Sequence, residues 1–524
     1  MSRVRGRTPG STALYAARRI REIEEVADGG EIDVLVVGGG ITGAGVALDA
    51  ASRGLRTVLV ERGDLASGTS AWSSKLVHGG LRYLASGQIG IALESAAERH
   101  LLMTRIAPHL TRPLAQVLPL HGTDARSRGA FVGTGYALGD ALRRGVGTPS
   151  ALLPAPSRLS AAAVRNLAPA VRVDGLHSGI RGWDGQLVDD ARLVVAVART
   201  AAGFGARILT RVTAQRLRGD GAELRDAVTG ATFTVRARAV VNATGVWAGS
   251  LTDAVALEPS RGTHLVVDSA RLGGADVSIT ALVPGSRSRF VFSVPALHGR
   301  SYIGLTDVAA DEITDDPRPD AAEIDFLLDT MSTVLADPLT RADVRGTFSG
   351  LRPLLRSVHA GGGETADLSR RHAVIEDDHG VLSVVGGKLT TYRRMAQDSV
   401  DAAVRRRALP TARPSLTADL PLVGAWPRER TGEIRAAARL VRRYGAEASF
   451  VAGLGERGSA AGPSAACGVT PAELEWGVRV EGALSVADLL HRRTRLGLVA
   501  ADAEASADAA RDAFARAGID PVAE

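Results

Sequence analysis

Residues 33–61, DVLVVGGGITGAGVALDAASRGLRTVLVE, decide the fold of this chain. The apolar run at 33–37 is typical of a strand buried in a parallel sheet, and residues 44–52 have the composition of a helix. A second apolar run, residues 57–60, ends in Glu61. The order strand, glycine-rich turn, helix and strand predicts the βαβ unit that opens a Rossmann-like, dinucleotide-binding parallel sheet.

The glycines of the turn have separate tasks. Gly38 allows the tight turn, Gly40 lets a pyrophosphate approach backbone N–H groups, and Gly43 lets the helix pack closely on the strand. The partial positive charge at the helix N-terminus favours the phosphates. Glu61 can accept hydrogen bonds from both hydroxyls of a ribose and would repel a 2′-phosphate, which disfavours NADP. We therefore expect a dinucleotide site formed by these four residues.

Small and polar residues gather in three further segments that lie far apart in the chain: 64–84 (DLASGTSAWSSKLVHGGLRYL), 242–245 (NATG) and 386–393 (GGKLTTYR). A nicotinamide-dependent dehydrogenase would continue after Glu61 with alternating strands and helices. Three close backbone approaches fit a flavin dinucleotide that lies extended along the protein instead. The sequence therefore predicts FAD as the cofactor.

The composition is that of a globular protein and excludes several kinds of site. The chain has 524 residues, of which 45% are hydrophobic and 23% charged. Its single cysteine, Cys467, excludes a disulfide framework, a cysteine-based zinc site and a redox-active C-x-x-C pair, and no metal is expected. The net charge is +6, but the arginines are spread along the chain without an aromatic pattern, so nucleic acid is not an expected partner.

Lysine is rare in this chain, because Lys75 and Lys388 are the only lysines among 63 basic residues. Since arginine is used elsewhere, these two positions are candidates for places that need a compact ammonium group. Both lie inside the glycine-rich segments described above.

The sequence predicts a cytoplasmic protein, because it has neither a signal peptide nor an apolar run of about 18 residues. Contact with the inner face of the cell membrane as a peripheral protein is a further expectation. The candidate segments are two basic amphipathic helices, residues 11–27 and 433–444. The first of these could instead pack on the body of the protein.

Short strand patterns between residues 207 and 305 predict a second sheet. The expected fold class is α/β, with an FAD-binding, Rossmann-like parallel sheet, an inserted, mainly antiparallel substrate-domain sheet and a small C-terminal helical domain. The expected boundaries are an N-terminal helical extension at 1–30, an oxidoreductase core at 31–405 with its substrate domain at about 115–180 and 260–345, and C-terminal helices at 410–524. A capping box that begins at Thr470 marks one of those helices.

Four motifs resemble the FAD-dependent glycerol-3-phosphate dehydrogenases: residues 33–54, 64–84, 350–355 (GLRPLL) and 385–396 (VGGKLTTYRRMA). The likeness extends from about residue 31 to the C-terminal helical domain. It implies oxidation of sn-glycerol 3-phosphate to dihydroxyacetone phosphate, with hydride passing from substrate C2 to flavin N5. It also implies that a membrane quinone then receives the electrons.

The resemblance assigns roles to individual residues. His264 matches the histidine near the reacting hydroxyl, and Arg352 and Lys388 are expected to take part in catalysis as well as in substrate binding. The expected substrate-binding residues are Arg82, Tyr83, Arg352, Arg370 and Lys388. The expected cofactor-binding residues are Gly38, Gly40, Gly43, Glu61, Thr69, Ser70, Ser74, Lys75, His78, Gly79, Gly80, Thr244, Gly245, Gly387, Leu389 and Thr390.

The chemistry of these residue types agrees with that assignment. A phosphorylated substrate needs several convergent cations, and oxidation of an alcohol needs a base for the hydroxyl proton, for which histidine is suited near neutral pH. Each residue also has a structural alternative. Arg352 and Arg370 could be surface residues, His264 a core histidine, and Lys75 the donor of a local hydrogen bond.

Two segments depart from the family pattern, namely 293–296 (SVPA) and 304–307 (GLTD). Both lie in the expected substrate domain, so the substrate is less firmly indicated than the cofactor. An oxidase that uses oxygen, a flavin oxidoreductase of 2-hydroxy acids or amino acids, and a non-enzymatic flavoprotein scaffold are the alternatives. The oligomeric state is left open, with a homo-oligomer as one alternative.

Overall fold

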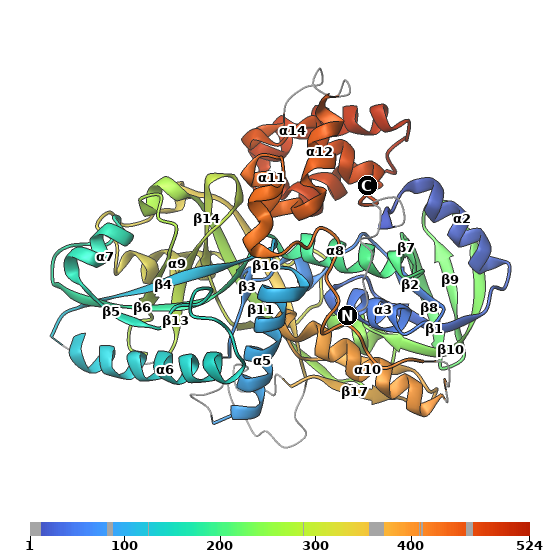
Figure 1. Ribbon diagram of the computed structural model, residues 1–524, viewed down its shortest axis with the longest axis horizontal. Coiled ribbons are helices and arrows are strands. Elements are labelled where there is room, and N and C mark those ends of the chain that lie inside the picture. The colour runs from blue at the N-terminus through green and yellow to red at the C-terminus, as the bar shows by residue number, and fades with distance from the viewer. Residues whose placement is uncertain are drawn as a thin grey trace.

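The computed structural model describes residues 12–80, 87–123, 125–286, 288–355, 371–407, 409, 412–456 and 465–523. Two sheets lie side by side, and the C-terminal helices sit above the junction between them (Figure 1). This arrangement confirms the expected α/β fold class with a parallel sheet, a mainly antiparallel sheet and a helical C-terminal domain.

The first sheet has the strand order β17-β18-β10-β1-β2-β7, and the neighbouring pairs from β18 to β7 are parallel. A hairpin of β8 and β9 extends β10. The strands are β1 (Ile32–Val37), β2 (Thr57–Glu61), β7 (Arg207–Thr210), β8 (Val212–Arg218), β9 (Gly221–Asp226), β10 (Thr232–Asn242), β17 (Ala373–Glu376) and β18 (Leu382–Val385).

Helices cover one face of this sheet, where Val34 and Val36 pack among apolar residues of α3 (Ile41–Ser52), α8 (Asp190–Gly203) and α10 (Tyr392–Arg406). On the other face, Leu35 and Val37 pack against the β8–β9 hairpin and Val26 of α2 (Ala16–Ala27). Because strand β1 is buried on both faces, its sequence is apolar without alternation.

The second sheet has the order β15-β11-β14-β13-β12-β4-β6-β3, with β16 paired to β11 and β5 to β6. Its pairs are antiparallel except for β12 with β4. The strands are β3 (Leu76–Val77), β4 (Thr111–His121), β5 (Ser157–Ser160), β6 (Leu176–Leu187), β11 (Leu257–Asp268), β12 (Ser278–Leu282), β13 (Phe290–Pro295), β14 (Arg300–Gly304), β15 (Val308–Ala309) and β16 (Val344–Leu355).

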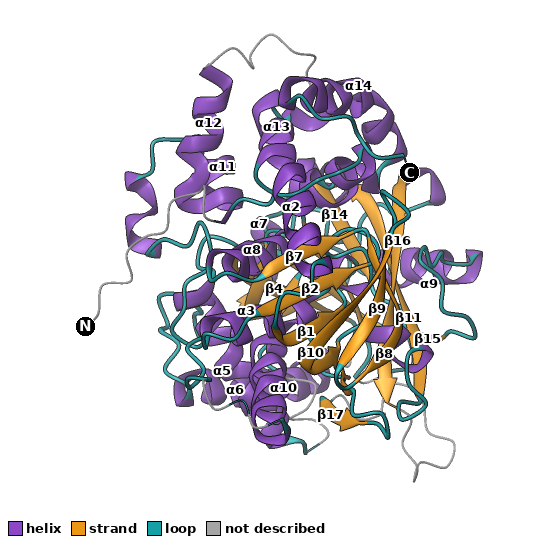
Figure 2. Ribbon diagram, turned by 90° about the vertical axis from the view of Figure 1, so that its right-hand side faces the viewer, coloured by secondary structure: helices purple, strands orange, loops and turns teal. Residues whose placement is uncertain are grey.

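Helices also pack on the second sheet. Helices α7 (Ala161–Leu167) and α9 (Ala321–Ser332) contribute to its main apolar cluster, and α6 (Ala125–Gly145) packs on β4 and β6. Figure 2 shows the strands at the centre of the molecule, with the C-terminal helices above them and α9 at one side. Helix α5 (Ile89–Leu101), which a π-helical turn at Leu102–Ile106 continues, contacts α6.

The C-terminal domain contains α11 (Ala438–Tyr444), α12 (Ala448–Glu456), α13 (Pro471–Arg479) and α14 (Ala500–Ala517). The capping box at Thr470 is present, because its hydroxyl accepts from the Glu473 N–H and its own N–H donates to the Glu473 carboxylate. The prediction of a helix over 433–444 is wrong at its start. A 3-10 turn at Arg428–Glu433 precedes α11, which begins only at Ala438.

Buried ion pairs join the C-terminal domain to the parallel sheet and its helices. Arg192 and Arg199 of α8 each form two hydrogen bonds with a carboxylate, Glu481 and Glu447 respectively. Arg493 binds Asp64, at the end of β2, in the same way. Removing one partner of such a pair would leave an uncompensated buried charge and would destabilise this interface.

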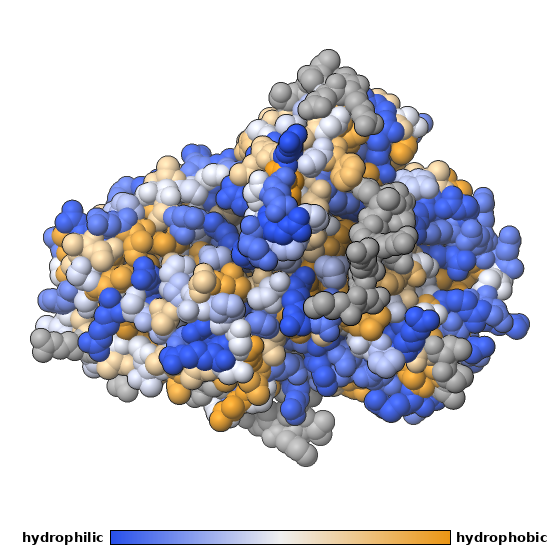
Figure 3. All heavy atoms as spheres, in the orientation of Figure 1, coloured by the Kyte–Doolittle hydropathy of each residue, from blue (hydrophilic) through white to orange (hydrophobic). Residues whose placement is uncertain are grey.

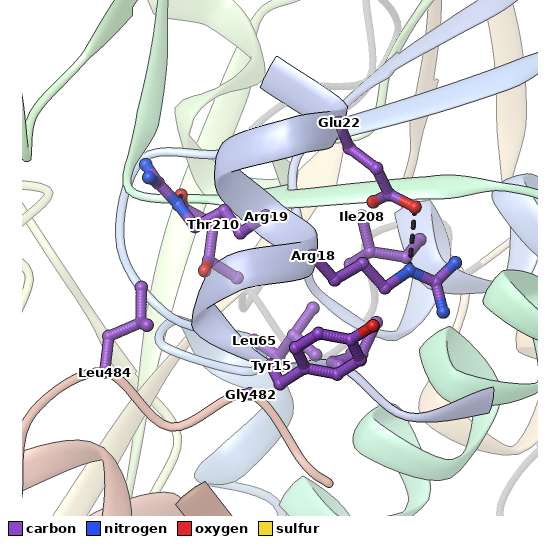
Figure 4. A pocket seen from close by; sticks show the side chains of 10 residues that line it. Tyr15, Arg18, Arg19, Glu22, Leu65, Ile208, Thr210, Gly482 and Leu484 are labelled. Atoms are coloured by element: carbon purple, nitrogen blue, oxygen red, sulfur yellow. Dashed lines mark hydrogen bonds and ion pairs between the residues drawn. The ribbon is translucent and has the colours of Figure 1, made fainter. Parts of the chain in front are cut away.

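The N-terminal helix α2 (Ala16–Ala27) packs on the body of the protein, as one of the two expectations had it. Its Arg18 donates to Glu22, and Arg19 donates to the Thr210 carbonyl and to Asp226. Figure 4 shows Arg18, Arg19 and Glu22 beside an open hollow that Leu484 of the C-terminal domain also lines. Over the residues described, no helix is both long and apolar enough to cross a bilayer.

Candidate active site

The glycine-rich turn forms a cradle whose walls are backbone. A side chain at Gly43 would place its Cβ 1.9 Å from the Gly38 carbonyl oxygen, and one at Gly38 would lie 2.6 Å from the Ala243 carbonyl oxygen. Gly38 also has a φ of +112°, which glycine adopts readily. The next wall is Ser70, whose hydroxyl accepts from the Ile41 N–H at 2.9 Å. The turn thus leaves no room for side chains at these two glycines.

Glu61 lies beside the cradle at the carboxyl end of β2. Its carboxylate accepts from the backbone N–H groups of Gly39 at 2.6 Å and Gly63 at 2.7 Å. Burial raises the pKa of Glu61, and these hydrogen bonds oppose the rise. The carboxylate therefore lies next to the position expected for the ribose of the cofactor.

The segment 69–80 contacts the second sheet and the 3-10 turn Leu389–Thr391 that leads into α10. The Thr69 hydroxyl donates to the Leu351 carbonyl of β16 at 2.6 Å, and the Ser74 hydroxyl lies 2.9 Å from Nε2 of His264 on β11. At its far end the His78 N–H donates to the hydroxyl of Thr390 at 3.2 Å. Two of the segments that the sequence analysis singled out, 64–84 and 386–393, therefore meet at Thr390.

The other expected cofactor residues lie at turns that follow strands or precede helices. Thr244 follows β10 and its hydroxyl donates to Asn242 at 2.7 Å, while Gly245 has a φ of +61°. Gly387 has a φ of +72°, and Leu389 and Thr390 belong to the 3-10 turn that leads into α10. Thr244 thus stands next to the cradle, because it also contacts the position that a Gly38 side chain would take.

Helix α5 packs directly on Gly79 and Gly80. A Cβ at Gly79 would lie 2.1 Å from the Arg99 guanidinium, and one at Gly80 would lie 2.8 Å from the backbone of Ala92. The carboxylate of Asp184 accepts from the Gly79 N–H, forms an ion pair with Arg99 and lies 3.4 Å from Nδ1 of His78. These contacts indicate that His78 helps to fix the segment, and its contact with the cofactor stays a prediction.

The ammonium group of Lys75 points into the protein. It is buried and has three acceptors within hydrogen-bond distance: the carboxylate of Asp190 at 2.9 Å and the carbonyls of Ala71 at 3.0 Å and Ser73 at 2.9 Å. Burial lowers the pKa of Lys75 to about 8. The structure thus favours local hydrogen bonds for this side chain, and a cofactor contact of its backbone stays a prediction.

His264 is 2% exposed and its ring stacks on Phe348 of β16, with ring centres 4.7 Å apart. The ring lies over Gly304 of β14, where a Cβ would come within 2.2 Å of it. Burial holds the pKa of His264 well below its usual range, and the charges of Lys75 and Arg352 lower it further. The imidazole is therefore neutral near pH 7 and able to accept a proton.

Arg352 lies on the same face of the second sheet as His264. Its guanidinium donates to the hydroxyl of Ser260 at 3.1 Å, to Asp307 at 3.0 Å and to the Thr306 carbonyl at 3.2 Å. Gly262, two residues before His264 and hence on its face, makes room for the guanidinium, because a Cβ there would lie 2.0 Å from Nη2.

Sequence reasoning missed Gly262, Gly304 and Asp307 as parts of this site. The signal for the first was its spacing of two residues from His264 in a strand. The roles of Gly304 and Asp307 depend on the pairing of β11 with β14 and β16, in which His264 faces Gly304 and Ser260 faces Arg352. No local pattern contains that pairing.

Lys388 lies in a different part of the structure from the contacts of Arg352. Its ammonium donates to the Ser95 hydroxyl of α5 at 2.7 Å. It lines a pocket of about 300 Å³ with Arg371, His372, Thr391 and residues of the first turns of α5. Three expected substrate-binding residues, Arg82, Tyr83 and Arg370, lie outside the described residues.

A backbone cradle at the end of a parallel sheet, next to an antiparallel sheet that carries a buried histidine and an arginine, defines an FAD-dependent oxidoreductase. The glycine cradle, Glu61 and the polar segment 69–80 fit that cofactor. The model of the family described as FAD dependent oxidoreductase matches residues 33–393, and that of the C-terminal domain of alpha-glycerophosphate oxidase matches residues 415–517.

Comparisons with individual proteins identify the family more closely. Glycerol-3-phosphate dehydrogenase 1 of Mycobacterium tuberculosis is 51% identical over 514 residues, covering 97% of this chain and 99% of the relative. The aerobic glycerol-3-phosphate dehydrogenase of Staphylococcus aureus is 35% identical, covering 72% and 67%. The glycerol-3-phosphate dehydrogenase of Bacillus halodurans, solved in complex with FAD, has a TM-score of 0.72 at 27% identity, covering 95% and 93%. The chain belongs to the FAD-dependent glycerol-3-phosphate dehydrogenase family, and FAD is its cofactor.

Proposed function

We propose that this protein oxidises sn-glycerol 3-phosphate to dihydroxyacetone phosphate. The proposal rests on the position of two side chains, neutral His264 and Arg352, on the same face of the second sheet. Ser74 contacts His264 on that face. The Arg352 guanidinium suits phosphate oxygens, and His264 takes the proton of the C2 hydroxyl as the hydride leaves C2. Bound FAD supplies the acceptor, N5, for that hydride.

The resemblance to the family also implies that Lys388 binds the substrate, although its ammonium donates to Ser95 of α5 and lies apart from the contacts of Arg352. Its pocket is lined by a second cation, Arg371, and by the carboxylate of Glu94. Arg82, Tyr83 and Arg370 would complete the binding site, as the resemblance to the family implies. A 2-hydroxy acid would need fewer cations than a phosphate ester, and this favours the phosphorylated substrate.

We propose a membrane quinone as the electron acceptor and a peripheral position on the inner face of the membrane. The exposed apolar residues Ile89 and Leu93 of α5 and Phe131 and Leu138 of α6 are 63%, 47%, 57% and 52% exposed. Both helices lie at the lower side of Figure 1, and apolar residues gather along that edge in Figure 3. Helix α2 is a poorer candidate, because Arg18 and Arg19 bind the protein itself.

Anaerobic reduction of the flavin tests the reaction. Purified protein with bound FAD is mixed with glycerol 3-phosphate, and the visible flavin band is expected to bleach. A band that lactate or an amino acid bleaches, and glycerol 3-phosphate does not, would contradict the proposal. If no substrate bleaches it, a non-enzymatic flavoprotein is favoured. Steady turnover with a quinone analogue and negligible peroxide separates a dehydrogenase from an oxidase.

Sedimentation with vesicles of anionic phospholipid tests the membrane surface. We expect Phe131→Ser with Leu138→Ser to reduce the bound fraction, because both remove apolar side chains from one face of α6. Phe450→Ser on α12 is the matched control, since Phe450 is exposed to a similar extent, 55%. Equal binding of the double variant and the control would place the membrane contact elsewhere.

A further inference from the structure

Lys75 belongs to a buried cluster that the proposed reaction does not yet use. Asp190, in the first turn of α8, pairs with Lys75 at 2.9 Å, and Nη2 of Arg495 lies 3.9 Å from the other oxygen of the same carboxylate. Asp189 lies 3.8 Å from Nε of Arg495. Arg495 comes from the C-terminal domain, just after the π-helical turn Asp488–Thr494. We call Lys75, Asp190 and Arg495 the Lys75 cluster.

The cluster holds the turn at residues 71–75 from two sides. From α8, Asp190 accepts from both the N–H and the hydroxyl of Ser73, at 2.9 and 2.7 Å. From the C-terminal domain, Arg495 donates to the Ala71 carbonyl at 2.6 Å and its guanidinium lies 5.2 Å from the centre of the Trp72 ring. The position of the turn therefore depends on the docked C-terminal domain.

The same turn carries the contact to the candidate base. Ser74, between Ser73 and Lys75, lies 2.9 Å from Nε2 of His264. The Lys75 ammonium lies 4.4 Å from the centre of the Phe348 ring on which His264 stacks. Leu498 and Val499 of the C-terminal domain pack in the apolar cluster of Phe348. Two paths thus lead from the C-terminal domain to His264, one polar and one apolar.

Charge and backbone conformation show that this arrangement is specific. Burial would raise the pKa of Asp190, but the charges of Lys75 and Arg495 hold it below its usual range. Lys75 and Arg495 both have a left-handed backbone, with φ of +58° and +67°. Residues other than glycine adopt this conformation only where their surroundings enforce it, often at functional sites.

We propose that Arg495 is a positioning residue for the oxidation, through which the C-terminal domain fixes the turn 71–75 and thereby the Ser74–His264 contact. This inference rests on the proposed function. A base must be held in a narrow range of geometry, and Arg495 touches neither His264 nor the substrate. It acts by holding the Ala71 carbonyl in place beside the carboxylate of Asp190.

The test compares Arg495→Gln with Arg199→Gln in the full-length holoenzyme. Arg199 is also a buried arginine at the interface between α8 and the C-terminal domain, but it binds Glu447 rather than the turn. We expect Arg495→Gln to keep its FAD and to lower the limiting rate of anaerobic flavin reduction by about 10- to 100-fold, with little change in the half-saturating glycerol 3-phosphate concentration. Arg199→Gln should lower the Tm and leave that rate near wild type.

A pH profile adds a readout that simple destabilisation would not move. When the turn loosens, water reaches His264 and its pKa rises, so the reduction rate of Arg495→Gln should fall on the acid side at higher pH than in the wild type. If Arg495→Gln does not fold, Arg495→Lys carries the test. This variant keeps the positive charge but not the planar guanidinium, so we expect its reduction rate to be lower than that of the wild type by less than tenfold.

Three outcomes would overturn the inference while the proposed function stands. These are equal rates for Arg495→Gln and Arg199→Gln, an acid limb that does not move, or an Arg495→Lys variant as fast as the wild type. A wild-type flavin that glycerol 3-phosphate fails to reduce would instead overturn the proposed function itself, so the two failures are distinguishable.

Discussion

The cofactor cradle and the face that carries His264 are built in opposite ways. The cradle is made mainly of backbone, from residues 38–43 and the Ala243 carbonyl, and a Cβ at Gly43 would collide with the Gly38 carbonyl. The face that carries His264 is made of side chains, His264 on β11 and Arg352 on β16, with Gly304 of β14 leaving room for the imidazole ring. The first region tolerates almost no change in side-chain size, and the second depends on which side chains face one another.

This difference shows which kind of substitution damages each region. A backbone site is lost through steric conflict, since any added atom must displace backbone. A side-chain site is lost through missing charge or hydrogen bonds, since its partners then lie buried without compensation. The two kinds of damage should separate in experiment into loss of FAD and loss of turnover with FAD retained.

The largest effect is expected for Gly43→Ala. The added Cβ would lie 1.9 Å from the Gly38 carbonyl oxygen, so the helix must move away from the cradle. Overpacking of this kind costs about 1–3 kcal/mol, or roughly a 5- to 150-fold loss of FAD affinity. The flavin absorbance per protein measures it. Gly135→Ala is the control, because nothing lies within 4 Å of a Cβ there. An unchanged flavin content in Gly43→Ala would contradict the expectation that steric conflict in the cradle causes loss of FAD.

Arg352→Gln should damage the other region and spare the cradle. Removing the guanidinium takes away its hydrogen bond to Asp307 and the bidentate partner proposed for the substrate phosphate, at a cost of about 2 kcal/mol or more. We expect kcat/KM for glycerol 3-phosphate to fall by roughly 30-fold while the flavin content stays normal. Arg345→Gln, on the same strand but exposed and paired with Asp268, should behave as the wild type. Loss of flavin in Arg352→Gln would contradict the separation of the two regions.

The smallest effect concerns pH. The pKa of His264 lies well below its usual range because of burial and the charges of Lys75 and Arg352. A lowered pKa keeps the base neutral as the pH falls, so kcat/KM of the wild type should show no acid limb attributable to His264 down to about pH 6.5. In Arg352→Gln one of these charges is gone, and the acid limb should move to higher pH. A wild-type limb near pH 7 that vanishes on replacement of His264 would contradict the burial of this base.

Much of the fold could be predicted because its signals are local. The apolar strand, glycine turn and helix at residues 33–52 and the capping box at Thr470 each depend on neighbours in sequence. The helix expected over 433–444 failed because apolar spacing alone does not show where a helix begins, and α11 starts at Ala438. The expected contact of Lys75 with the cofactor stays a prediction. The structure shows that the Lys75 ammonium binds Asp190, which is 115 residues away in the chain.

By itself, the sequence determined the class of cofactor, the order of the elements and the residues that merit attention at the site. These follow from steric needs of backbone and from strand and helix periods, which act over a few residues. Only the tertiary structure decided that Arg352 lies over Gly262 beside His264, and that Arg495 of the C-terminal domain holds the turn of Ser74. The physical reason is that strand register and domain docking are set by the summed packing of distant segments, and no single motif encodes that sum.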